Sequence, residues 1–80
     1  MTTQKRKIAQ DAGRIESMML RYQRQVGEVT ARHTIHDIEY RTGLKIDAAK
    51  KAVEYMIDLE MIAADICHGT LFYYLKGITK

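Results

Sequence analysis

The chain has 80 residues, of which 46% are hydrophobic and 29% charged, values typical of one globular domain spanning 1–80. A single cysteine excludes an intrachain disulfide framework, and no apolar run approaches the ~20 residues of a membrane span. We therefore expect a cytoplasmic protein without membrane contact. The formal net charge is +3, but it is uneven. Residues 1–33 carry seven basic and three acidic side chains, whereas residues 34–80 carry six and seven.

The first predicted element is a long helix from about Thr3 to Gln25, with Gly27 as its C-terminal stop. Apolar side chains recur at steps of four and three, which draws one stripe along a helix. The stripe comprises Ile8, Ala12, Ile15, Met19, Tyr22 and Val26. Two interpretations remain open. The stripe docks on the domain core, or its first two turns project outward and pair with a second copy, because the spacing also fits a heptad.

The second predicted helix runs from Thr34 to Thr42. Thr34 followed by Asp37 resembles a capping box, in which a hydroxyl and a carboxylate satisfy the free amides at the helix start. Ile35 and Ile38 should face inward. Gly43 then ends the helix, since a tight turn between helices favours a residue that tolerates positive φ.

The third predicted helix covers roughly Lys45 to Glu60, and Asp47 would cap it if the helix began two residues later. Polar side chains, among them Lys50 and Lys51, fall on the solvent side. The expected buried stripe comprises Leu44, Ala49, Ala52, Val53, Met56 and Leu59.

The last predicted element is a hairpin, in which Ile62–Cys67 and Thr70–Leu75 flank the two-residue turn His68-Gly69. Such a loop fixes the register, with Cys67 opposite Thr70 and Ile62 opposite Leu75. The face expected to be buried comprises Ile62, Ala64, Ile66, Leu71, Tyr73 and Leu75. The outer face carries the aromatic pair Phe72 and Tyr74. Either this pair marks a contact surface, or the N-terminal turns of the first helix cover it.

Three helices followed by a hairpin predict a mainly α fold, a winged helix-turn-helix with an extended first helix. The helix-turn-helix is expected at 34–60, the wing at 62–75, and a first helix that could also dimerise at 1–27. The strings "IHDIEYRTGL", "AAKKAVEYMIDLEMI" and "GTLFYYLKG" resemble winged-helix regulators, especially the small FaeA-like regulators of fimbrial operons. This resemblance implies a bacterial or phage transcription factor that contacts DNA.

The geometry of that fold puts the N-terminal half of the third helix in a major groove. The expected DNA-contacting residues are Lys45, Asp47, Lys50, Lys51, Arg41, Thr34 and His68. The third helix carries no Arg, Asn or Gln there, the types that make bidentate base contacts, so we expect phosphate-dominated binding with modest sequence preference. Lys7, Arg14 and Arg21 recur every seven residues and suit phosphates, an acidic protein surface, or simple solvation.

The main expectation is therefore a dimeric DNA-binding transcriptional regulator of double-stranded DNA. The alternative is a winged-helix adaptor that binds a larger protein complex. Dimer or partner contacts are expected at Ile8, Ile15, Met19, Tyr22, Phe72 and Tyr74. We expect no metal, no cofactor and no catalytic residue. The histidines and Cys67 match no zinc spacing, and Cys67 and His68 should point to opposite faces of the hairpin.

Overall fold

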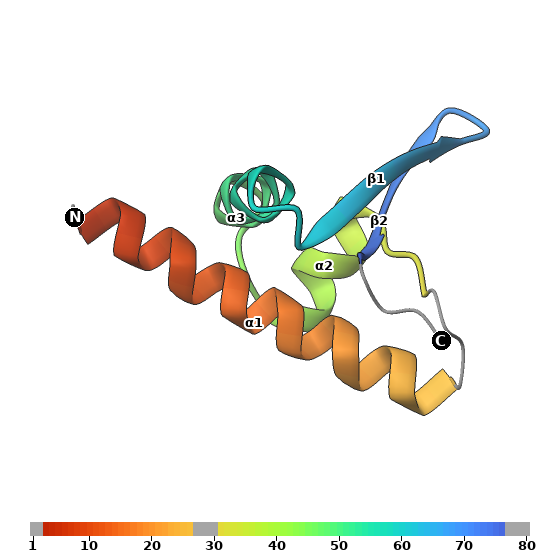
Figure 1. The fold of residues 1–80 in the computed structure, drawn as a ribbon, viewed down its shortest axis with the longest axis horizontal. Helices are drawn as coiled ribbons and strands as arrows, with labels where there is room; N and C mark the ends of the chain where they lie inside the picture. The colour runs from red at the N-terminus through yellow and green to blue at the C-terminus, as the bar shows by residue number, and fades with distance from the viewer. Residues whose placement is uncertain (1–2, 27–30, 77–80) are drawn as a thin grey trace.

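The computed structural model describes residues 3–26 and 31–76, and Figure 1 shows three helices followed by a hairpin. The long first helix runs along one side, the other two helices pack on it, and the hairpin projects from the opposite side (Figure 1). This mainly helical chain with a two-stranded antiparallel sheet is compatible with a winged-helix-like topology. The elements are α1 (Thr3–Val26), α2 (Ile35–Thr42), α3 (Ile46–Asp58), β1 (Ile62–Cys67) and β2 (Thr70–Leu75).

The apolar stripe of α1 enters the core, as one of the two interpretations predicted. Ile15 and Met19 are at most 1% exposed and pack in one cluster with residues of α2, α3 and the hairpin. Both were expected as contacts to a second copy, and this expectation is wrong, because a side chain buried within its own domain cannot reach a partner. Gly27, the expected helix stop, lies outside the described residues.

The capping box at the start of α2 is confirmed. The Asp37 amide donates to Thr34 Oγ1, and the Thr34 amide donates to Asp37 Oδ2, both over 3.1 Å. Gly43 ends the helix with φ 78°, and its amide donates to the Glu39 carbonyl. The left-handed conformation is accessible to glycine at little cost, so the tight turn into α3 follows from the sequence.

Helix α3 is shorter at both ends than the sequence predicted. Its N-cap is Lys45, so Asp47 lies within the first turn and does not cap the helix. At the other end α3 stops at Asp58, and Leu59 becomes the C-cap residue with 55% of its surface exposed. The expectation that Leu59 joins the buried stripe is therefore wrong, since the chain leaves helical geometry before Leu59 can turn inward.

The hairpin register is confirmed at all six pairs, from Ile62 opposite Leu75 to Cys67 opposite Thr70. His68 and Gly69 have φ of 53° and 78°, the two positive values that a type I′ turn requires. The face expected to be buried divides in two, and this corrects the prediction. Its basal side chains Ile62, Tyr73 and Leu75 are buried, whereas its distal side chains Ala64, Ile66 and Leu71 are exposed.

A third backbone segment joins the base of this hairpin. The amide of His33 donates to the Tyr73 carbonyl over 2.9 Å, and the Tyr73 amide donates to the His33 carbonyl over 2.7 Å. The segment before α2 thus bridges to β2 on the edge that β1 leaves free. The sequence analysis missed this bridge, because a single paired residue produces no alternation pattern.

Arg32 covers the outer face of the hairpin near its base. Its guanidinium pairs with Asp65 over 3.0 Å and lies 5.3 Å from the centre of the Tyr74 ring. Phe72 and Tyr74 are half-buried. The N-terminal turns of α1, proposed as the cover for this aromatic pair, lie beside α3 instead, far from the hairpin (Figure 1).

Candidate nucleic-acid interface

The N-terminal half of α3 presents a group of exposed lysines. Lys45, Lys50 and Lys51 are all exposed, as is Asp47. The buried side of the same helix carries alanines, valine and methionine, which fix its rotation against α1 and α2. Within the described chain, none of the three lysines has a carboxylate oxygen within 4.0 Å. Their charges are therefore uncompensated by ion pairs there.

The backbone at the start of α3 adds to this positive character. Lys45 occupies the N-cap position, and no side chain there bonds to the free amides of the first turn. The start of α2 differs, because Thr34 and Asp37 already occupy its amides. An uncapped helix N-terminus presents backbone N–H groups and the positive end of the helix dipole, both suited to a phosphate oxygen.

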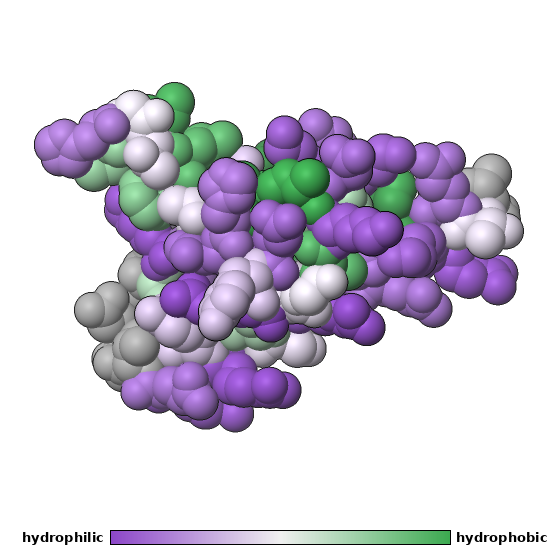
Figure 2. Space-filling model, turned by 180° about the vertical axis from the view of Figure 1, so that it is seen from behind, coloured by the Kyte–Doolittle hydropathy of each residue, from purple (hydrophilic) through white to green (hydrophobic). Residues whose placement is uncertain are grey.

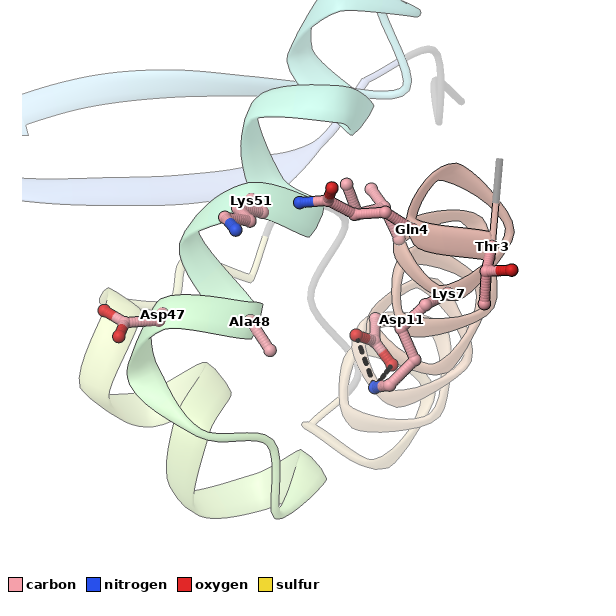
Figure 3. A pocket seen from close by; sticks show the side chains of 8 residues that line it. Thr3, Gln4, Lys7, Asp11, Asp47, Ala48 and Lys51 are labelled. Carbon is pink, nitrogen blue, oxygen red and sulfur yellow. Dashed lines mark hydrogen bonds and ion pairs between the residues drawn. The ribbon is translucent and has the colours of Figure 1, made fainter. Parts of the chain in front are cut away.

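The first turns of α1 flank the same end of α3. A pocket between the two helices is lined by α1 side chains that include Lys7 and by α3 side chains that include Lys51, and Gln4 extends from α1 toward α3 (Figure 3). Lys7 donates to both carboxylate oxygens of Asp11 over 3.0 Å, and Asp11 is only 6% exposed. The sequence analysis missed this juxtaposition, although the basic residues before Ile8 were its visible signal.

The remaining predicted DNA contacts do not gather with the α3 lysines. The Thr34 hydroxyl is engaged as the cap of α2. His68 lies exposed at the tip of the projecting hairpin (Figure 1). Arg41 turns toward α1, where its guanidinium lies 4.2 Å from the centre of the Tyr22 ring. The structure thus brings together Lys45, Asp47, Lys50 and Lys51 but separates the other three.

Arg41 is held in place by a buried histidine. An Arg41 Nη1–H donates to His33 Nδ1 over 3.0 Å, and the His33 ring meets the edge of Tyr22 at 5.1 Å between centroids. Burial, and after it the Arg41 charge, lower the pKa of His33 below its ordinary value of 6.5, while Asp37 opposes this shift. A neutral His33 that accepts from Arg41 carries its proton on Nε2, which is buried without a hydrogen-bond partner.

Arg41 also belongs to a second basic surface, which we call the arginine groove. It lies between α1 and α2 and is lined by Arg14, Arg21 and Arg41, together with Gly13, Ser17, Met18 and Thr42. Arg14 and Arg21, two of the three basic residues that recur every seven positions on α1, therefore line the same groove as Arg41 of α2. The third member, Lys7, lies elsewhere, in the pocket beside α3.

The other predicted partner contacts are less accessible than expected. Ile8 is half-buried between α1 and α3, and Tyr22 is half-buried beneath Arg41. The most exposed apolar side chains include Ile66 at 70% and Leu71 at 42%, both on the distal hairpin. Figure 2 shows hydrophobic atoms on this projecting hairpin at the upper left, and a second hydrophobic group near the centre of the same face.

Comparisons with protein-family models, with curated proteins and with solved structures found no match to this chain. Among residues 3–26 and 31–76, no group of three His, Cys, Asp or Glu side chains is placed to hold a metal ion. Within the same ranges, no helix is long and apolar enough to cross a membrane.

Proposed function

We propose that this chain is a winged-helix transcriptional regulator that binds double-stranded DNA through the N-terminal half of α3. The observation that carries the proposal is the coincidence of exposed Lys45, Lys50 and Lys51 with an uncapped helix start. In helix-turn-helix proteins, this end of the second helix of the motif enters the major groove. Lysine ammonium groups and free backbone amides both suit phosphate oxygens, so the contact is dominated by the DNA backbone.

The charge distribution along α3 supports this docking. Lys50 and Lys51 lie in the first half of its exposed face, whereas Glu54 and Asp58 lie in the second half. A recognition helix that enters a groove by its N-terminal end places its later turns away from the phosphates. Glu54 and Asp58 are then outside the contact, where they cause little repulsion, whereas Asp47 in the first turn stays within it.

The bridge between His33 and Tyr73 also supports a winged helix. It pairs His33, just before α2, with the free edge of β2 through two backbone hydrogen bonds. This pairing anchors the base of the wing to the helices.

Fluorescence anisotropy of a labelled random-sequence duplex, titrated at low and near-physiological salt, tests this function. We expect affinity that falls steeply with salt, with a logarithmic slope of about −0.9 for each phosphate contacted. Replacing Lys50→Glu and Lys51→Glu together should weaken duplex binding by at least about tenfold. The matched control, Arg14→Glu with Arg21→Glu, changes net charge equally and should retain duplex binding. If the wild-type chain does not bind the duplex at low salt, the proposed function is refuted.

The adaptor alternative is favoured by the exposed apolar side chains of the distal wing, Ile66 and Leu71. Exposed apolar patches often mark contacts with proteins. Under that function, Ile66→Ser with Leu71→Ser would abolish capture of a purified partner. The wild-type chain itself would not bind the duplex. Under the DNA-binding function, the same double variant retains most of its duplex affinity.

A further inference from the structure

We propose that the arginine groove between α1 and α2 binds an acidic segment of a partner protein, on a surface separate from the α3 lysines. This inference does not depend on DNA binding, because it concerns other residues on other elements. The occupant is defined by its chemistry, a peptide segment whose carboxylates meet guanidinium groups.

The charge of the groove is the first argument. Arg14, Arg21 and Arg41 are exposed and line it together, and none of its other lining residues is acidic. In the described ranges of the chain, no carboxylate oxygen lies within 4.0 Å of these three guanidinium groups. Three like charges around one groove repel each other. An anionic occupant relieves that repulsion and can form bidentate hydrogen bonds with planar guanidinium groups.

The preorganisation of Arg41 is the second argument. Its guanidinium lies over the Tyr22 ring at 4.2 Å and donates to the buried His33 Nδ1 over 3.0 Å. An exposed arginine ordinarily loses side-chain entropy when it binds a partner. Here the structure has already fixed the side chain, so Arg41 can meet a carboxylate with a smaller entropy loss. A guanidinium has five N–H donors, so one bond to His33 leaves others for an occupant.

The shape of the groove favours a peptide over a duplex. Its α1 wall includes Gly13 and Ser17, two small exposed residues, and among residues 3–26 and 31–76 nothing beyond the adjoining turns of α1 lies within 4 Å of the place where a Gly13 Cβ would be. A peptide backbone can therefore approach α1 closely here. A DNA duplex presents a convex surface, so it fits a hollow between two helices less closely than an extended peptide does.

The position of the groove separates it from the proposed DNA surface. All its lining residues come from α1 and α2, and α3 and the hairpin supply none. In Figure 1 the hairpin and α3 lie on the side of the molecule opposite the C-terminal half of α1. The two surfaces therefore share no residue, although Thr42 of the groove lies only three residues before Lys45.

The test uses the full chain and two labelled probes, a fluorescein-labelled oligo-glutamate peptide and a random-sequence duplex. Arg14→Glu with Arg21→Glu should weaken peptide binding by at least about tenfold and leave duplex binding unchanged. The matched control, Lys50→Glu with Lys51→Glu, has the same net charge and should retain peptide binding. Glutamate is a good helix former, and all four positions are exposed, so circular dichroism should show both double variants folded.

Arg41→Lys provides a second variant that keeps the charge. Because lysine cannot stack as a planar fork or bind bidentately, we expect peptide binding to weaken several-fold with unchanged duplex binding. Three outcomes would overturn the proposal. They are an absence of peptide binding by the wild-type chain, an equal loss of peptide affinity in the two double variants, and a loss of duplex binding alone in the variant that combines Arg14→Glu with Arg21→Glu. The last outcome would assign the groove to the DNA surface.

Discussion

The base and the tip of the hairpin have the same sequence pattern but different environments. Ile62 at the base is 1% exposed, whereas Ile66, four residues later on the same face of β1, is 70% exposed. On the opposing strand, Leu75 is 8% exposed and Leu71 is 42% exposed. The two halves share one register and one alternation, so local structure does not distinguish them.

The difference arises from what the helices can cover. Helices α1, α2 and α3 all contact the hairpin, and the buried cluster includes Ile62, Tyr73 and Leu75 but no residue nearer the tip. The tip extends beyond the helices (Figure 1). Its strands are held by the backbone ladder and the type I′ turn rather than by a core. The comparison shows that alternation predicts a strand and its faces, but only the packing of other elements decides which part of a face is buried.

The largest expected effect is at the base. Ile62→Ala removes fully buried methyl and methylene groups and leaves a cavity among the helices, so the free energy of unfolding should fall by about 3 kcal/mol. Urea unfolding followed by circular dichroism measures this change. A loss below about 1 kcal/mol would show that the base is no better packed than the tip, and the comparison would fail.

A smaller effect concerns pH and again separates base from tip. Burial and the Arg41 charge lower the pKa of His33 in the folded chain, so the unfolded chain binds a proton more readily than the folded one. The contribution of neutral His33 to the free energy of unfolding should therefore be complete above about pH 6.5. It should be lost progressively as the pH falls below that value. Urea unfolding from about pH 7.5 to about pH 5 measures the decline.

Two histidine variants assign that decline to the base. His33→Gln removes the titrating group, so part of the decline should disappear. His68→Gln, at the exposed tip, is the matched control for the same chemical change. Equal pH dependence in the wild-type chain and the His33 variant would mean that His33 does not titrate differently on folding.

The smallest effect is expected at the tip. Ile66→Ala makes the same chemical change as Ile62→Ala at a position that is already in solvent, so only strand propensity is lost. We expect the free energy of unfolding to fall by less than about 1 kcal/mol, in the same urea experiment. A larger loss would indicate that the tip is buried in solution, as it would be against a second copy, and measurements across protein concentrations would reveal this.

The candidate sites show the same division between local and tertiary information. The exposure of Lys50 and Lys51 was predictable, because the helical period places them opposite the alanines and valine of α3. The arginine groove was predictable only in part. The spacing placed Arg14 and Arg21 on one line of α1, but nothing local indicated that Arg41 of α2 would face them.

The sequence by itself determined the helices, the capping box of α2, the turn at Gly43 and the complete hairpin register. These features depend on neighbours within a few residues, whose hydrogen bonds and φ preferences act locally. Only the tertiary structure decided the burial of Ile15 and Met19, the exposure of the distal hairpin, and the bridge between His33 and Tyr73. Each of these depends on where a distant element packs, and one chain's periodicity shows that a face is apolar without showing what will cover it.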